Sequence, residues 1–474
     1  MKVFFVNIFC LLSINSAFSK MLTDSLVISD SVETSRDSLM LLPDLYINRI
    51  LIAGNDITDE EIITRELVTK ENSKLDYTEL EEDIQRLYDL NLFNKVDVYP
   101  APSDSINKVD LVILVEERFY IIPLPQGGFR NGEFSKFWAG LNLVWNNFRG
   151  RNERAALSFG IGYEPFIGLS YSVPWIGKKA HFYSSASMNY SKNYNQSLQA
   201  LNDTTSNTIP SSANNFAIYN FNAAYTLGKF FTKNFSLASS VRYNIIHSSQ
   251  YEPGRTVSPD GKDNYLTLLF SGRFDTRNSH EYTLAGSYYF LEYTKFGFGK
   301  LFDFNRVSFD VRKFIPIKVF NNYNFTFASM GFGAISFGGT IPYYLKEYFG
   351  YGKIIRGYKK IVFEGENQMG VFSEFRLPII NPFYFKGESV PVVSEISMLK
   401  SMSYKFGLYL TLFFDVGGVW NKGSKFFKTQ FYNGFGSGLN FILPFGFIGR
   451  TDFAFRVEDK RFVPQIIFDL DAAF

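Results

Sequence analysis

The chain has 474 residues, a formal net charge of +2 and a mean hydropathy of −0.06. The near-neutral charge argues against a nucleic-acid partner, because proteins that bind phosphate backbones carry a basic excess. Phe, Tyr and Trp make up 18% of the residues, an enrichment that suits β-strands and the aromatic girdles of membrane barrels. After the N-terminal region no apolar run approaches the roughly 20 residues of a membrane-spanning helix, which excludes a helical membrane protein.

Residues 1–19 have the layout of a secretory signal peptide. Lys2 supplies a positive start, residues 3–12 form a short apolar stretch, and residues 17–19 form a small-x-small cleavage site. The alternative is a buried first strand. We therefore expect the chain to be exported.

Residues 20–44 are rich in Ser and Asp, and we expect them to form a solvated, acidic linker. The only cysteine, Cys10, lies in the signal segment behind the bulky Phe9. We expect neither lipidation at this position nor a disulfide in the exported chain.

Residues 45–117 predict a small α+β domain. A strand at Ile47–Ala53 precedes two helices that are expected to begin at Thr58 and Thr78, each followed three residues later by a Glu that completes a capping box. Two more strands complete the order β-α-α-β-β, at residues 96–98 and 109–115.

From Tyr120 to the end, apolar and polar residues alternate with a period of two. Within 404–417, Phe406, Leu408, Leu410, Leu412 and Phe414 share one face, while Lys405, Tyr409, Thr411, Phe413 and Asp415 share the other. A soluble β-sandwich also alternates. Many of the segments here exceed the usual five or six residues of a strand, which favours strands that cross a membrane.

The alternation predicts a mainly β protein in which residues 118–474 form an antiparallel transmembrane β-barrel of about sixteen strands, an even number as in bacterial barrels. The expected strands begin near Tyr120, Phe137, Glu153, Ile167, His181, Asn215, Asn234, Asn264, Tyr282, Phe304, Tyr323, Gln368, Tyr404, Gly434, Ile448 and Val463.

Strand parity predicts which links face outward. With the N-terminal domain in the periplasm, odd-numbered strands run outward, so the longest links lie outside the cell; these are 196–214, 250–262, 338–366 and 420–431. The link 379–403 does not fit, because it is long and falls on the periplasmic side.

The last strand predicts a signal for barrel assembly. Phe468, Leu470 and Phe474 alternate along one face and end on an aromatic residue, a pattern that an assembly machine can bind by strand addition. The alternative is an ordinary C-terminal strand.

Two parts of the chain resemble one known family. The 45–117 pattern, with Gly54-Asn55 and Leu92-Phe93-Asn94-Lys95-Val96, resembles a POTRA domain. Ile355-Arg356-Gly357-Tyr358 resembles the VRGF/Y motif on the long loop of the BamA/TamA outer-membrane assembly superfamily, also called the bacterial surface antigen family. Ser373–Pro378 and Phe413–Gly417 resemble the two strands that follow this loop.

The resemblance implies that the inserted loop, 338–366, folds back into the barrel lumen. Parity places Glu374 and Asp415 on the lumen faces of neighbouring strands, where an arginine could bind both carboxylates. We therefore expect Arg356 to pin the loop through Glu374 and Asp415, with Gly357 allowing a close backbone approach. The alternative is a solvated Arg356 beside acids that face lumen water.

The resemblance also implies a function. It predicts a non-enzymatic assembly, insertion or translocation factor of the bacterial outer membrane, whose partners are membrane lipids and unfolded client proteins bound through residues 45–117. A single POTRA-like domain departs from the several that BamA usually carries, so membership in the essential assembly machine and any accessory partners stay open.

Three other functions remain as alternatives. A two-partner secretion pore is one, although such pores usually carry two POTRA domains and a plug helix. A passive porin is another, although a POTRA-like domain argues against it. An enzyme is the third, but His181, His247 and His280 show no metal-ligand spacing and no nucleophile elbow fits before residue 45. We expect no catalytic residue, metal or other cofactor.

Overall fold

The computed structural model describes residues 45–105, 107–129, 134–177, 181–201, 215–252, 254–299, 302–320, 323–386, 403–443, 447–469 and 474. The signal peptide expected at 1–19 and the linker at 20–44 lie outside these residues. The described chain forms two compact units, one of residues 45–55 and 66–116 and one that begins with 56–65 and continues from 117 onward. None of its helices is long and apolar enough to cross a membrane.

The smaller unit is an α+β domain with a three-stranded sheet in the order β1-β3-β2. Its elements are β1 (Tyr46–Ala53), α3 (Tyr77–Asp89), β2 (Phe93–Pro102) and β3 (Lys108–Glu117), and β1 runs parallel to β3. Ile47, Leu75, Leu80 and Leu111 form its buried core. Along the chain, the β-α-α-β-β order expected from the sequence is confirmed; its first helix, α2 (Glu60–Thr64), groups with the larger unit.

Both predicted helix caps are wrong. The helix α3 is capped by Asp76, whose side chain accepts the backbone N–H groups of Thr78 and Glu79. The helix α2 begins only at Glu60, and its N-cap residue makes no side-chain cap. Thr58 instead donates its hydroxyl to Glu117 at 2.5 Å, so a partner distant in the sequence displaces the local capping box.

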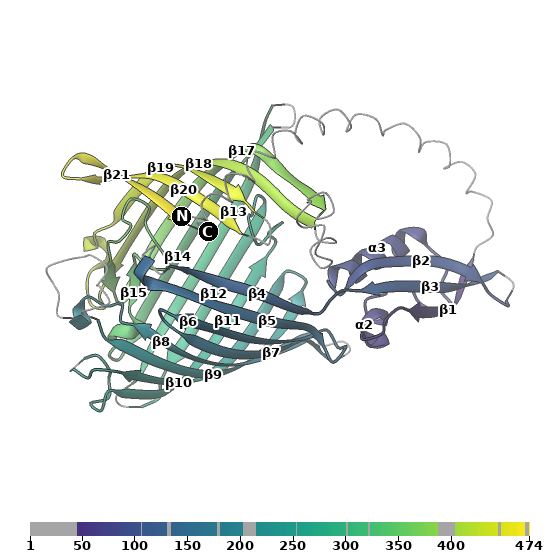
Figure 1. Cartoon of the computed structure of the whole chain (residues 1–474), viewed down its shortest axis with the longest axis horizontal. Helices are drawn as coiled ribbons and strands as arrows, with labels where there is room; N and C mark the ends of the chain where they lie inside the picture. The colour runs from purple at the N-terminus through teal and green to yellow at the C-terminus, as the bar shows by residue number, and fades with distance from the viewer. Residues whose placement is uncertain are drawn as a thin grey trace, which may run out of the picture. The chain divides into compact units, whose positions relative to one another are not determined.

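The larger unit is built on a sixteen-stranded antiparallel sheet that curls into a barrel (Figure 1). Each strand pairs with the next barrel strand along the chain, so that β14 pairs with β17. The strands β4 and β21 stand at the two ends of the order. The strands are β4 (Ile121–Phe129), β5 (Phe137–Phe148), β6 (Glu153–Gly162), β7 (Phe166–Ile176), β8 (Phe182–Tyr194), β9 (Ala217–Thr232), β10 (Phe235–Ser248), β11 (Lys262–Asp275), β12 (Gly286–Phe296), β13 (Phe304–Phe320), β14 (Tyr323–Gly338), β17 (Asn367–Lys386), β18 (Ser403–Trp420), β19 (Tyr432–Ile442), β20 (Ile448–Glu458) and β21 (Arg461–Asp469).

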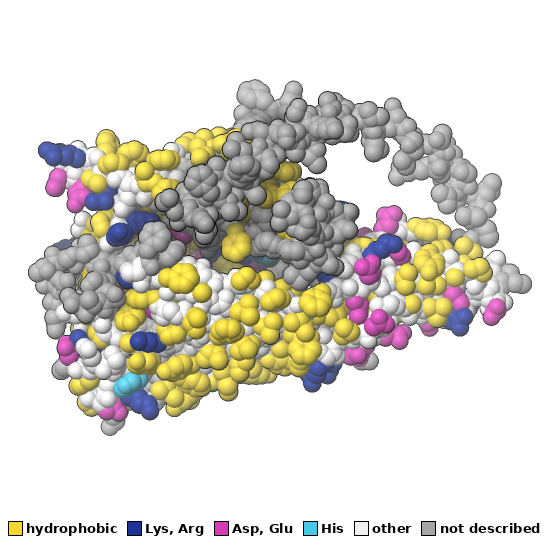
Figure 2. Space-filling model, in the orientation of Figure 1, with side chains coloured by type: hydrophobic (Ala, Val, Ile, Leu, Met, Phe, Trp, Pro, Cys, Tyr) yellow, Lys and Arg dark blue, Asp and Glu magenta, His cyan; other side chains and the backbone are white. Residues whose placement is uncertain are grey.

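The faces of the strands alternate as the sequence predicts. On β18, Leu412 and Phe414 are 48% and 52% exposed, whereas Asp415 is completely buried. Hydrophobic side chains cover much of the outer wall of the barrel in Figure 2. The predicted fold class, a barrel of sixteen strands behind a small α+β domain, is confirmed.

The link expected at 379–403 is shorter than the sequence suggested. The strand β17 continues to Lys386 and pairs with β18 down to the partners Lys386 and Ser403, across two irregularities in register. The misfit of strand parity at this link is therefore partly an effect of strand length, because β17 continues past the point where its alternation ends.

Candidate functional site

The inserted loop joins β14 to β17 and carries its own two-stranded ribbon of β15 (Glu347–Phe349) and β16 (Phe363–Gly365). Ile355, the first residue of the loop motif, is buried with Phe349 and Phe363 of the ribbon. The same cluster contains Phe332 of β14 and Phe372 of β17, which belong to the barrel wall. Apolar packing therefore holds the motif against the inside of the barrel.

Arg356 is buried and binds two carboxylates of the wall. Its Nη1 donates to Oε1 of Glu374 at 2.5 Å, while its Nη2 and Nε donate to Oδ1 and Oδ2 of Asp415 at 2.6 and 2.7 Å. The backbone N–H of Arg356 also donates to Asp415 Oδ2 at 3.1 Å. The structure thus brings together all three residues that the sequence analysis singled out.

An aromatic ring and two glycines allow Arg356 and its backbone to pack closely against the barrel wall. Its guanidinium lies 3.7 Å from the ring centroid of Phe413, which provides a cation–π contact. A Cβ atom at Gly434 on β19 would stand 1.6 Å from the carbonyl oxygen of Arg356, so only glycine leaves room for the loop backbone. Gly357 has a φ of +99°, and its carbonyl accepts a 2.9 Å hydrogen bond from Arg456 of β20.

Tyr358, the last residue of the motif, makes edge contacts with the rings of Phe363 and Tyr432. The following residue, Lys359, exchanges two hydrogen bonds with the amide of Gln465 on β21, at 2.7 and 3.1 Å. Together with the hydrogen bonds of Arg356 and Gly357, these bonds connect residues 355–359, the motif region, to β17, β18, β20 and β21.

A second arginine, Arg376, extends the charge cluster, and the sequence analysis missed it. It is fully buried on β17 and donates to Glu374 Oε2 at 3.0 Å, to the carbonyl of Thr283 at 2.6 Å and to the carbonyl of Phe474 at 3.1 Å. Arg376 lies two residues after Glu374, so strand parity alone would have placed it on the lumen face.

Asp452 on β20 was also missed. Its carboxylate is buried, and neither of its oxygens has a hydrogen-bond partner among the described residues, although Arg450 Nε lies 3.2 Å from one of them. Arg450 also pairs with Asp469 of β21 at 2.8 Å. The sequence signal was the alternation of Arg450, Asp452 and Ala454 along one face of β20.

A separate anchor holds the ribbon of the loop. Arg306 on β13 pairs with Glu347 of β15 at 2.7 Å, and its guanidinium also donates to Ser336 at 2.9 Å. On the other side, Glu364 of β16 accepts hydrogen bonds from Ser197 and Leu198, which follow β8. The loop is thus tied to the barrel at several separate places.

The residues of the predicted assembly signal do not share one face. Phe468 on β21 is 69% exposed on the outer wall, whereas Phe474 contacts Arg376 and Phe314 inside the barrel. Leu470 lies outside the described residues. Continuing the strand's alternation to the last residue was therefore wrong for Phe474, and the role of these residues in assembly stays a prediction.

The geometry of the cluster suits anchoring. Buried guanidinium and carboxylate groups neutralise one another through charge-assisted bonds, and removing one partner leaves an uncompensated charge. Within the described part of the chain, no three His, Cys, Asp or Glu side chains are grouped so that they could hold a metal.

Comparison with known proteins gives two family matches. The family model described as the Omp85 superfamily domain matches residues 147–468. The model described as POTRA, the surface antigen variable number repeat, matches residues 45–118.

Two curated relatives match parts of the chain. Outer envelope protein 80, chloroplastic, of Oryza sativa subsp. japonica is 29% identical over 130 residues, which are 25% of this chain and 19% of that protein. Outer membrane protein assembly factor BamA of Nitratidesulfovibrio vulgaris is 26% identical over 113 residues, 24% of this chain and 14% of that protein. The matches therefore span less than a fifth of either relative.

Two solved structures share the fold. BamA from Haemophilus ducreyi lacking POTRA domains 1–3 superposes with a TM-score of 0.62 at 17% identity, covering 90% of this chain and 83% of that chain. CdiB from Acinetobacter baumannii superposes with a TM-score of 0.53 at 13% identity, covering 90% and 74%. The Omp85 model covers more than half of the chain, so this protein belongs to the Omp85 superfamily, as an outer-membrane β-barrel preceded by one POTRA domain.

Proposed function

We propose that this protein inserts client proteins into a bacterial outer membrane, or moves them across it, with its POTRA domain in the periplasm. Members of its superfamily are non-enzymatic assembly and translocation proteins. The observation that carries the proposal is the buried bonding of Arg356 to Glu374 and Asp415, which fixes a loop inside the lumen.

Clients are proposed to bind through residues 45–117. The sheet order β1-β3-β2 leaves β1 and β2 at the edges of this small sheet, and residues 72–75 already bond to the first half of β1. An extended client segment could add to the edge of β2 through its own backbone. Backbone bonds of this kind accept many sequences, which suits a factor with unfolded barrel proteins as clients.

The ends of the barrel sheet are the proposed site of insertion. The strand β4 contains Pro123 and Pro125, and the strand β21 contains Pro464. Proline has no N–H to donate to a ladder, so both end strands offer fewer hydrogen bonds than their length allows. A weakly bonded junction between β4 and β21 could open sideways without nucleotide hydrolysis, driven by client binding and by thinning of the membrane beside it.

The test is depletion of the protein in its native host. The amounts of many other barrel proteins in the outer membrane should fall, and the wild-type gene should restore them. Arg356→Ala should fail to restore them, whereas Arg273→Ala, which removes a lumen-facing arginine of β11, should succeed. Unchanged barrel protein levels after depletion would contradict the proposal.

A secretion pore for one dedicated passenger is the second candidate, and the shared fold with CdiB favours it. Depletion would then remove one protein from the medium and leave the outer-membrane barrels unchanged. A passive porin would instead show a large, steady conductance with its loop in place.

A further inference from the structure

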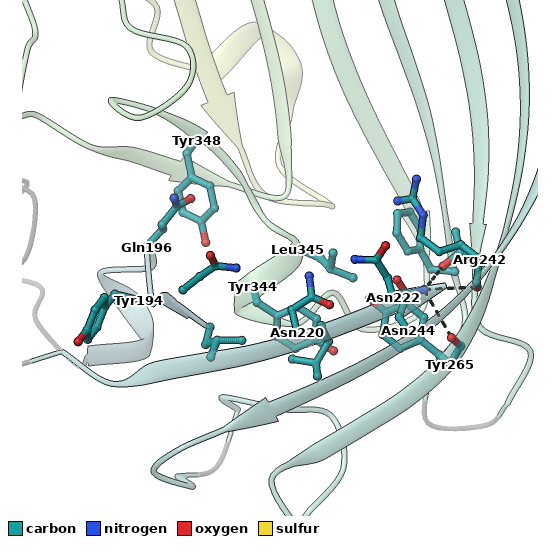
Figure 3. A pocket seen from close by; sticks show the side chains of 15 residues that line it. Tyr194, Gln196, Asn220, Asn222, Arg242, Asn244, Tyr265, Tyr344, Leu345 and Tyr348 are labelled. Atoms are coloured by element: carbon teal, nitrogen blue, oxygen red, sulfur yellow. Dashed lines mark hydrogen bonds between the residues drawn. The ribbon is translucent and has the colours of Figure 1, made fainter. Parts of the chain in front are cut away.

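A cavity of about 290 Å³ lies inside the barrel, between the strands β8 to β12 and the inserted loop (Figure 3). None of the residues of the Arg356 cluster lines it. The lining residues on which the argument rests are Asn220, Asn222, Arg242, Asn244, Tyr265 and Tyr344.

Amide side chains stand in a row across the strands that form one wall of the cavity. Asn222 of β9 is the direct partner of Asn189 on β8 and of Asn244 on β10, and Asn244 is in turn the partner of Tyr265 on β11. Directly paired residues point to the same face of a sheet. Figure 3 shows Asn220, Asn222 and Asn244 close together on the strands below the loop.

Several polar atoms of this wall have unused hydrogen-bonding capacity. Asn220 Oδ1 is buried and has no partner within the described chain. Asn244 donates its Nδ2 to Thr267 Oγ1 at 2.9 Å and to the carbonyls of Arg242 and Tyr265 at 3.5 Å, which leaves its Oδ1. Asn222 accepts at its Oδ1 from Asn189 at 3.3 Å, which leaves its Nδ2. Buried polar groups are nearly always bonded, so this wall is suited to an occupant that both donates and accepts.

One cation lines the cavity. Arg242 on β10 points into the lumen, and among the described residues no carboxylate forms an ion pair with it, in contrast to the buried arginines of the loop anchors. A free guanidinium presents a planar fork of donors that fits a carboxylate or a phosphate. The occupant should therefore carry one acidic group.

The apolar side of the cavity is preformed. Tyr265 stacks on Phe302 with ring centroids 4.1 Å apart, and the hydroxyl of Tyr344 donates to Asp263 at 2.6 Å. These contacts fix two aromatic rings beside the amide row. Flat rings next to amides suit a sugar, whose C–H face packs on an aromatic ring while its hydroxyls bond to amides.

We propose that this cavity binds an acidic sugar, a hydroxylated ring that carries one carboxylate or phosphate. The volume is at the lower limit of the roughly 300–1,000 Å³ typical of small-molecule sites, so it accommodates a sugar ring rather than a length of polypeptide. The ligand could be the headgroup of a membrane glycolipid or a free acidic sugar. The proposal requires only the barrel and its loop, and it is independent of the proposed insertase function.

The experiment titrates the full-length protein in detergent micelles with glucuronate, a sugar phosphate, glucose and inorganic phosphate, using calorimetry. Both acidic sugars should bind more tightly than glucose and than phosphate. Arg242→Gln should weaken the binding of acidic sugars by about tenfold or more, since a charge-assisted pair is lost. Asn220→Leu should weaken acidic sugars and glucose alike.

The matched control is Arg273→Gln, which removes a lumen-facing arginine of the neighbouring strand β11 that does not line the cavity. It should leave every affinity unchanged, and all variants should keep the wild-type circular dichroism spectrum. A glycolipid and its delipidated sugar, compared in the same assay, identify the source of the ligand. The proposal is overturned if no acidic sugar binds, if inorganic phosphate binds as tightly as the acidic sugars, or if Arg242→Gln leaves the affinity for acidic sugars unchanged.

Discussion

At the scale of single residues, the anchor depends on balanced charge. Arg356 has two carboxylate partners, and Glu374 is shared with Arg376. Asp415 therefore depends on Arg356, whereas Glu374 has two arginines. An unpaired charge is costly at such buried positions, because it has lost the solvation that water provides at the surface. Removing one charge of the anchor should therefore destabilise the barrel more than removing an oppositely charged pair.

We expect Arg356→Ala to lower the free energy of unfolding of the barrel by about 3–5 kcal/mol, because it leaves the buried carboxylate of Asp415 unpaired. Adding Asp415→Asn to this variant should recover part of the loss, because Glu374 and Arg376 then remain as a balanced pair. Urea unfolding in detergent, followed by tryptophan fluorescence, measures both. If the double variant is less stable than Arg356→Ala, charge balance is not the source of stability.

Gly434→Ala should displace the loop, because the new Cβ would stand 1.6 Å from the carbonyl oxygen of Arg356. Limited proteolysis should cut the loop faster in this variant than in the wild-type protein. Gly331→Ala on β14 is the control, since a Cβ there meets nothing within 4 Å. Equal cleavage of both variants would show that the loop does not need the space.

The residues of the anchor differ in how far the sequence could place them. Parity put Glu374 and Asp415 on the lumen face, and the same rule would have found Arg376 had it been applied two residues further. The inward turn of Phe474 could not be foreseen, because it depends on Arg376 and Phe314, which are distant in the sequence.

At the scale of elements, period-two alternation predicts the start of most strands to within a few residues. It misses the end of β17, which extends past the apolar pattern to Lys386. Helix starts were less predictable. Thr58 stands in a capping-box sequence but bonds to Glu117. The capping-box rule uses only residues three apart in the sequence, so it cannot predict that partner.

The helix α3 should respond to acid through Asp83. This side chain accepts the backbone N–H groups of Val68 at 2.8 Å and Thr69 at 3.0 Å and pairs with Arg86. Burial raises the pKa of the Asp83 carboxyl, but its hydrogen bonds outweigh burial and hold that pKa below its usual value. The resulting stability is fully present above the unfolded-state pKa and is lost as the pH falls through the folded-state pKa.

Amide hydrogen exchange in the full-length protein measures this effect. Exchange of the Val68 and Thr69 amides should accelerate as the pH falls below about 4, beyond the intrinsic pH dependence of exchange. Asp83→Asn should remove most of that pH dependence. Asp89→Asn, an exposed position on the same helix, should keep it, and a loss in both variants would refute the assignment.

At the scale of the whole molecule, the loop and the barrel form one structure. The loop is bonded to β13 through Arg306 and to β17, β18, β20 and β21 through the motif region. Replacing residues 340–365 with a short Gly/Ser linker should raise the single-channel conductance and lower the unfolding temperature. An unchanged conductance would mean that the loop does not obstruct the lumen.

The paired bonds between Lys359 and Gln465 have a consequence for the direction of any sideways opening. If β21 separated from β4, the loop would stay with β21, because its ties run to the last strands of the sheet. The two sides of the gap would then differ, because β21 is held by the loop and, among the described residues, β4 is not bonded to the motif region. An arriving strand could find a free hydrogen-bonding edge on one side and a braced, less yielding surface on the other.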